Sequence, residues 1–247
     1  MSSSNATTDE RFAERRRTVR RRRILRVLLG VVSLGVLGGL VWVVWFSSAL
    51  AVNRIVIEGT TTVKPMDIRS QAAVRVGQPL VRVDTIAIES RVAAMERIDH
   101  VAVSRHWPRT IRIEVVERKA VAWVLSGGSI RALDRNGVDF RSYRVAPKDL
   151  VEVRVETVVS RKRQQGLESA TAVLGLLRTD EPDLLKKVQY VRVSSKDSVQ
   201  LVLGKNRTVT WGSAAKGEQK LRVLRPLLKI KARGYDVSAP EQPTTRR

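Results

Sequence analysis

The feature that most constrains this chain is an abrupt change from arginine-rich to apolar sequence near its start. Arg20–Arg23 and Arg26 are followed by Val27–Phe46, twenty residues without a charged side chain. A helix of that length rises roughly 30 Å, which matches the hydrocarbon core of a bilayer. The sequence therefore predicts a transmembrane helix over residues 27–46.

The residues on either side of this stretch predict its orientation. Residues 1–26 carry nine Arg against three acidic side chains, so the positive-inside rule predicts a cytoplasmic, Arg-rich, disordered arm. Residues after about Ser47 then lie outside the cytoplasm. Ala49-Leu50-Ala51 resembles a signal-peptide cleavage site, but a signal peptide has an apolar stretch of only about 7–15 residues. The length favours an uncleaved, single-pass anchor in the plasma membrane.

The charge of the outer portion bears on its partners. The 247-residue chain has a net charge of +22, of which +6 lies in the arm and +16 in the rest. Nucleic acid is the default partner of so basic a chain, and a membrane-tethered nucleic-acid binder would need this portion to face the cytoplasm. The predicted orientation argues against nucleic acid. It favours the lipid bilayer, wall polymers or an acidic protein as the contacted anion.

The outer portion divides into two patterns of predicted elements. Residues 52–122 predict the order β-α-α-β-β, and residues 110–115 show strict alternation of apolar and charged side chains. Residues 123–239 predict a mainly β domain with helices, including a two-residue hairpin turn at Asn136-Gly137 and a last helix that Pro226 kinks or divides. Residues 240–247 are expected to form a flexible tail. The predicted fold class is α+β.

The sequence offers little support for catalysis. His100 and His106 are the only imidazoles, the chain has no Cys, and Gly127-Gly128 lacks the Lys-Ser/Thr of a phosphate-binding loop. We therefore expect a binding protein and not an enzyme, with no catalytic, cofactor or metal site. A wall-active enzyme with paired carboxylates is the alternative that the sequence leaves open.

Five segments of the outer portion together resemble the FtsQ/DivIB family of bacterial cell-division proteins, and the tail is similar to that of actinobacterial members. The resemblance extends over the anchor, the first domain and the β domain. The segments are 55–59 (IVIEG), 77–80 (GQPL), 101–113 (VAVSRHWPRTIRI), 117–122 (ERKAVA) and 133–138 (LDRNGV).

The resemblance implies a scaffold of the division machinery at the septum. Residues 52–122 would be a POTRA domain. The β domain, residues 123–239, would recruit FtsB/DivIC-like and FtsL-like proteins, and through them the septal peptidoglycan synthase. A POTRA-containing secretion or outer-membrane assembly factor is the alternative.

The family's mode of binding implies a site on this chain. In the family, a partner segment adds to a late edge strand of the β domain. The last predicted strand here is short and bounded by Gly234 and Pro240, which independently suggests a free edge, although it could instead simply close the sheet. The expected partner-binding residues are Gly234, Tyr235, Asp236, Val237, Ser238 and Ala239.

Overall fold

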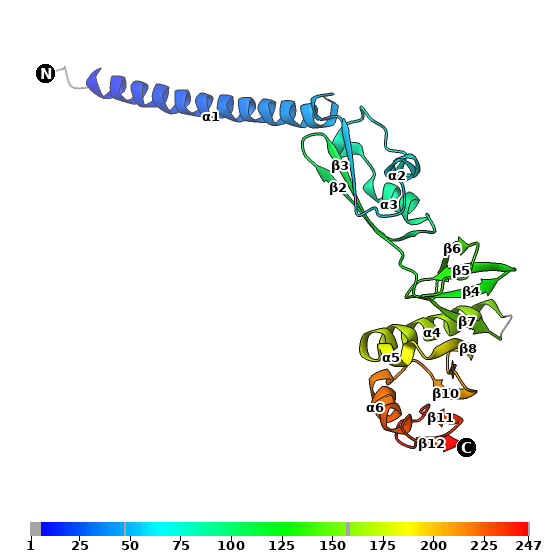
Figure 1. The fold of residues 1–247 in the computed structure, drawn as a ribbon. Coiled ribbons are helices and arrows are strands. Elements are labelled where there is room, and N and C mark those ends of the chain that lie inside the picture. Colours follow the sequence, from blue (N-terminus) through cyan, green and yellow to red (C-terminus); the bar gives the residue numbers. More distant parts are fainter. Residues whose placement is uncertain (1–5, 47, 157–158, 247) are drawn as a thin grey trace. The chain divides into compact units, whose positions relative to one another are not determined.

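The computed structural model describes residues 6–46, 48–156 and 159–246. Its fold is α+β, as predicted, and it divides into two compact units (Figure 1). The first unit comprises residues 1–60, 64–92 and 101–115. The second comprises residues 61–63, 93–100 and 116–247.

The first helix, α1, spans Ala6–Phe46 and contains the predicted membrane segment. Its apolar part, Leu25–Trp45, has a mean hydropathy of 2.5 and is long enough to cross a bilayer. The helix differs from expectation at its start, because it includes most of the arm that we expected to be disordered. Residues 6–29 contain no Gly or Pro and are rich in Arg, which has a high helix propensity, so nothing local ends the helix.

A three-stranded sheet, ordered β1-β3-β2, carries two helices and confirms the predicted β-α-α-β-β order. β1 pairs in parallel with β3, placing Ile57 opposite Ile113, and both Ile111 and Ile113 are fully buried. Ile68 and Ile88 bring the helices onto this core. The elements are β1 (Arg54–Glu58), α2 (Pro65–Ala72), α3 (Thr85–Ala93), β2 (Ile98–His106) and β3 (Thr110–Glu117), with short 3-10 turns η1 (Ser48–Leu50) and η2 (Leu80–Arg82).

The second unit is built on a nine-stranded sheet with the order β12-β11-β10-β9-β8-β7-β4-β5-β6. Helix α4 packs on it through fully buried Leu167, Leu174 and Leu177. The strands are β4 (Ala122–Ser126), β5 (Ser129–Leu133), β6 (Asp139–Tyr143), β7 (Val151–Val155), β8 (Val188–Ser195), β9 (Ser198–Leu203), β10 (Arg207–Gly212), β11 (Gly234–Asp236) and β12 (Thr244–Arg246); the helices are α4 (Ser160–Asp180), α5 (Pro182–Leu185) and α6 (Gly217–Leu227).

Three local features differ from the sequence prediction. Asn136-Gly137 lies in a loop of five residues, 134–138, and not in a two-residue hairpin turn. Helix α6 is not divided at Pro226: it ends one residue later, at Leu227, so the backbone hydrogen bond that proline cannot donate is missing only from the last turn. The expected flexible tail forms β12, which pairs with β11.

Candidate functional site

The segment expected to bind a partner lies inside the sheet and not at its edge. β11 pairs in parallel with β10 and antiparallel with β12, so Tyr235 lies between Val209 and Thr245. The expectation of a free edge at residues 234–239 is therefore corrected. β12 covers that edge because the chain turns back after Pro240 and reaches β11 again at Thr244.

The structure holds Tyr235 firmly in this strand. Its side chain is 1% exposed, and its hydroxyl donates to the carbonyl of Ile230 at 2.7 Å. The next residue but one, Val237, is fully buried, and its N–H donates to the carbonyl of Thr210 at 3.0 Å. These two residues anchor the segment to the core, and the Val237 N–H already has a partner within the sheet.

The remaining residues of the expected site do not continue the strand. Ser238 donates to Asp236 Oδ1 from its N–H at 2.9 Å and from its hydroxyl at 2.7 Å, which makes a tight turn. Ala239 follows as an exposed residue whose carbonyl accepts from the N–H of Gln242 at 3.0 Å. The six expected residues thus form a short strand, Gly234–Asp236, followed by a turn.

β12, which pairs with the expected site, is the element that the sequence analysis did not predict. It has three residues, all with exposed side chains, and the N–H of Arg233 donates to the carbonyl of Arg246 at 2.9 Å beside it. The β-branched pair Thr244-Thr245 is the signal that could have identified it. A strand this short, with no buried side chain of its own, contributes little to the core.

A cationic hollow adjoins β11. It has a volume of about 610 Å³ and is formed by the β9–β10 turn, the loop after α6 and the ring of Tyr235. Leu228, Ile230 and Ala232 give it an apolar part, and none of the described residues that line it is acidic. The hollow therefore suits an anionic ligand with an apolar group. The cationic lining residues are Lys205, Arg207, Lys229, Lys231 and Arg233.

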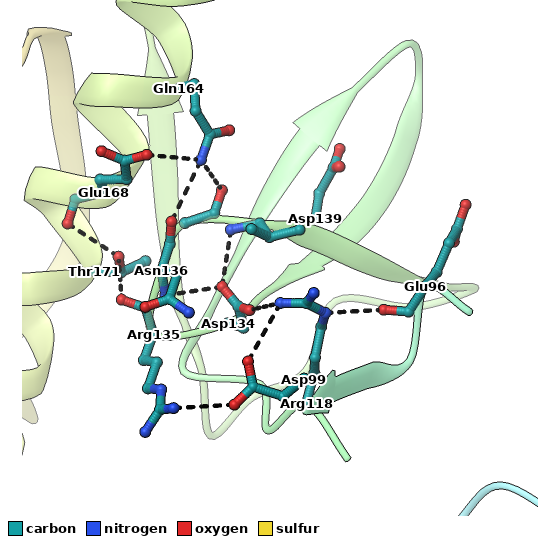
Figure 2. A network of polar contacts seen from close by, with 12 residues as sticks. Glu96, Asp99, Arg118, Asp134, Arg135, Asn136, Asp139, Gln164, Glu168 and Thr171 are labelled. Carbon is teal, nitrogen blue, oxygen red and sulfur yellow. Dashed lines mark hydrogen bonds and ion pairs between the residues drawn. The ribbon is translucent and has the colours of Figure 1, made fainter. Parts of the chain in front are cut away.

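The second unit also contains a dense polar network, centred on Arg118 and Asp134 (Figure 2). The guanidinium of Arg118 donates to the Asp134 carboxylate, lies 3.5 Å from Asp99, and donates to the carbonyl of Glu96 at 3.1 Å. Asp134 is 2% exposed, and its Oδ1 accepts from the N–H groups of residues 136 and 138 at 2.8 Å each. The buried carboxylate is thus paired and hydrogen-bonded, as a buried charge requires.

Helix α4 holds the other side of the loop that carries Asp134. Gln164 Nε2 lies 3.3 Å from the carbonyl of Asn136, and Thr171 Oγ1 lies 3.0 Å from the carbonyl of Arg135 (Figure 2). Arg135 in turn pairs with Asp99 at 3.0 Å. Because these polar groups bind one another, the network fixes a loop and is not arranged around a substrate.

Glu117 makes a second, separate set of polar contacts. Its carboxylate accepts from the N–H groups of Thr61, Thr62 and Val63 at 2.6–3.0 Å and from the Thr62 hydroxyl. Burial raises the pKa of Glu117, but the Thr62 hydroxyl and the backbone N–H groups more than offset this and lower the pKa to about 2. Glu117 is therefore ionised at neutral pH, where its carboxylate holds the 61–63 segment by hydrogen bonds and is a poor general acid.

Groups of side chains that could hold a metal were sought over the described residues. They contain no group of three or more His, Cys, Asp or Glu side chains placed to bind an ion. His100 and His106 both lie in β2 with exposed side chains. The cationic hollow beside β11 is the candidate site considered further.

Comparison with known proteins agrees with this architecture. Residues 50–118 match the family model of the POTRA domain, FtsQ-type. The chain is 38% identical over 231 residues to the "Cell division protein FtsQ" of Streptomyces venezuelae, which covers 90% of this chain and 83% of that protein. It is 40% identical over 205 residues to FtsQ of Streptomyces griseus, covering 80% and 97%, respectively.

A relative from another genus matches over a similar length of this chain. FtsQ of Mycobacterium tuberculosis is 33% identical over 225 residues, which covers 90% of this chain and 69% of that protein. These matches do not favour the alternative of a secretion or outer-membrane assembly factor. From the POTRA match and the relatives together, the chain belongs to the FtsQ family of bacterial cell-division proteins.

Proposed function

We propose that this protein is a single-pass scaffold of the division machinery that acts by binding and not by catalysis. Its arginine-rich start remains in the cytoplasm, and both folded units lie outside, at the division septum. Support comes from the family, from the apolar span Leu25–Trp45, and from the nine Arg residues that precede Val27.

The proposed partners are FtsB/DivIC-like and FtsL-like proteins, which link the scaffold to the septal peptidoglycan synthase. A partner segment pairs with Gly234–Asp236 and takes the place of β12. The observation that carries this proposal is the covering of β11 by a strand of only three residues, all exposed. A longer partner strand with apolar side chains offers more contacts to the same backbone edge.

The cationic hollow supports the same site. Its five Lys and Arg side chains lie beside β11, so a partner strand that carries carboxylates next to an apolar side chain finds both charge and apolar contact there. Electrostatic attraction of this kind mainly accelerates association and weakens as salt is added.

A reversible cross-strand disulfide tests the strand exchange. Asp236 lies opposite Thr244, and the chain has no Cys, so Asp236→Cys with Thr244→Cys gives a single disulfide that holds β12 on β11. We expect the oxidised full-length protein in nanodiscs to lose FtsB/DivIC-like binding and the reduced protein to regain it. Equal binding in both states would contradict the exchange.

A truncation after Gln242 provides the matched control. It removes β12 and leaves β11 intact, so we expect partner binding to be retained or tightened. If the truncated protein loses binding, the partner pairs with β12 and not with β11. If neither the full-length nor the truncated protein binds an FtsB/DivIC-like or FtsL-like protein, the proposed partners are wrong.

A further inference from the structure

In the first unit, the 3-10 turn η2 lies against Trp45, the C-terminal end of the apolar span Leu25–Trp45. Trp45 is the last residue of that span, and the guanidinium of Arg82, in η2, lies 5.9 Å from the centre of its ring. Ala51 forms an isolated bridge with Pro79, the residue before η2. If Leu25–Trp45 crosses the bilayer, Trp45 and therefore Arg82 lie at the level of the lipid headgroups.

The turn between β2 and β3 lies at the same end of the unit. The carbonyl of Arg109 accepts from the N–H groups of Asn53 and Arg54 at 3.0 and 3.2 Å. Only seven steps of the chain separate Phe46 from Asn53, a reach of at most about 25 Å even when fully extended. The turn at residues 107–109 is therefore confined to the neighbourhood of the membrane surface.

This turn carries the side chains that a headgroup layer accommodates. Trp107 is 54% exposed, although a tryptophan usually contributes to a core. Arg105 and Arg109 flank it with exposed side chains, and a guanidinium of Arg105 is oriented by a hydrogen bond to the carbonyl of Val83. An exposed indole between cations is the composition of an interfacial membrane contact.

We propose that Trp107 enters the headgroup layer of the outer leaflet, with Arg82, Arg105 and Arg109 on anionic lipid phosphates. This contact is independent of the partner site at β11. It fixes the orientation of the POTRA domain on the bilayer, in addition to the covalent tether at Phe46. Cations are attracted to an anionic surface within a Debye length, so the contact depends on lipid charge.

The experiment uses the cysteine-free full chain in nanodiscs with a nitroxide on a single introduced cysteine. His106→Cys places the probe next to Trp107. Met66→Cys is the control, because Met66 is 77% exposed at the start of α2, past the end of β1 that leads away from the anchor. The readout is the ratio of collision rates with oxygen, which concentrates in lipid, and with a water-soluble nickel chelate.

In phosphatidylglycerol nanodiscs we expect this ratio to be roughly threefold higher at residue 106 than at residue 66, and the excess to fall in phosphatidylcholine. The double substitution Arg82→Gln with Arg109→Gln is expected to reduce the dependence on lipid charge, which Arg105 alone then carries. Trp107→Ala is expected to remove most of the remaining excess. Circular dichroism of each variant verifies that the fold is retained, and the arginine variant alone tests the proposal if Trp107→Ala fails to fold.

Equal ratios at residues 106 and 66 in both lipids would overturn the proposal. So would a ratio at residue 106 that is insensitive to the arginine substitutions. Protection of residue 106 that develops only when a division partner is added to the nanodisc would identify the turn as a protein-binding site, which also overturns it.

Discussion

The guanidinium of Arg118 neutralises the buried carboxylate of Asp134. Removing Arg118 leaves that charge unpaired in a site where it is 2% exposed. We expect Arg118→Met to lower the free energy of unfolding by about 3 kcal/mol, as for other buried pairs that lose one partner. Urea unfolding of the full chain in detergent, followed by tryptophan fluorescence, measures this change.

Two further variants control this prediction. Arg192→Met removes an exposed partner of Glu156, at 3.2 Å, and is expected to cost less than about 1 kcal/mol. Adding Asp134→Asn to Arg118→Met is expected to recover part of the lost stability, since the amide oxygen still accepts from the loop and no charge remains. Equal losses for Arg118→Met and Arg192→Met would show that the pair is not effectively buried.

Gly137 lies in the same loop as Asp134, residues 134–138. Its φ is +71°, and an added Cβ would lie 2.6 Å from the backbone nitrogen of Glu168 in α4. We expect Gly137→Ala to cost about 3 kcal/mol or more, because a left-handed conformation and a backbone clash act together. Thermal unfolding monitored by circular dichroism measures the loss.

Gly128→Ala is the matched control. Gly128 also has a positive φ, +78°, but an added Cβ meets no atom within 4 Å. Its cost is expected to be about 1–2 kcal/mol, from conformation alone. A similar cost for both alanines would mean that α4 does not pack tightly against the loop.

The low pKa of Glu117 predicts how the stability of the protein changes as the pH falls. Its value of about 2, against an ordinary 4.5, means that its contribution to stability is complete above about pH 4.5 and is lost as the pH falls towards 2. We expect Glu117→Gln to cost about 1 kcal/mol at neutral pH, a discounted figure because the contacts are partly open to solvent. The difference from the parent protein is expected to close between about pH 4.5 and 2 in urea titrations.

Thr62→Val separates the causes of this shift. The Thr62 hydroxyl is the strongest of the groups that lower the pKa of Glu117, so its loss is expected to raise that pKa and to narrow the pH range of the effect. If Glu117→Gln and the parent protein differ in stability by the same amount at acid and at neutral pH, the low pKa assigned to Glu117 is contradicted.

Much of the fold could be predicted because its signals are local. Ile111 and Ile113 alternate with Arg112 and Glu114, and the structure buries the first pair and leaves the second pair partly or fully exposed. The order of elements in the POTRA domain follows from such runs and from the turn residues between them. The apolar span was equally evident, because length and composition alone define it.

Features that depend on long-range pairing could not be predicted in this way. Apart from the β-branched pair Thr244-Thr245, Thr244–Arg246 has no apolar alternation that marks a strand, and the backbone it pairs with is that of β11. Asp134 begins a five-residue loop where a two-residue turn was predicted, and its carboxylate pairs with Arg118, sixteen residues earlier, a contact that no local pattern indicates. At the candidate site the sequence indicated a short strand within residues 234–239, whereas the structure has one at Gly234–Asp236 followed by a turn, and the sequence did not indicate what lies beside it.

Tyr235 connects the candidate site to stability. Its hydroxyl donates to the carbonyl of Ile230 at 2.7 Å and accepts from the N–H of Ala232 at 3.4 Å, so it holds the loop that forms one wall of the cationic hollow. We expect Tyr235→Phe to cost about 1 kcal/mol of stability, because both backbone groups lose a partner. We also expect weaker binding of the FtsB/DivIC-like partner in nanodiscs, since the wall of the hollow becomes less ordered.

Tyr143→Phe is the control. It keeps a ring under the Arg141 guanidinium, 5.2 Å away, and is expected to change neither the stability nor the partner binding. If the Tyr235→Phe protein shows the predicted loss of stability but binds the partner unchanged, the cationic hollow is not part of the partner-binding site.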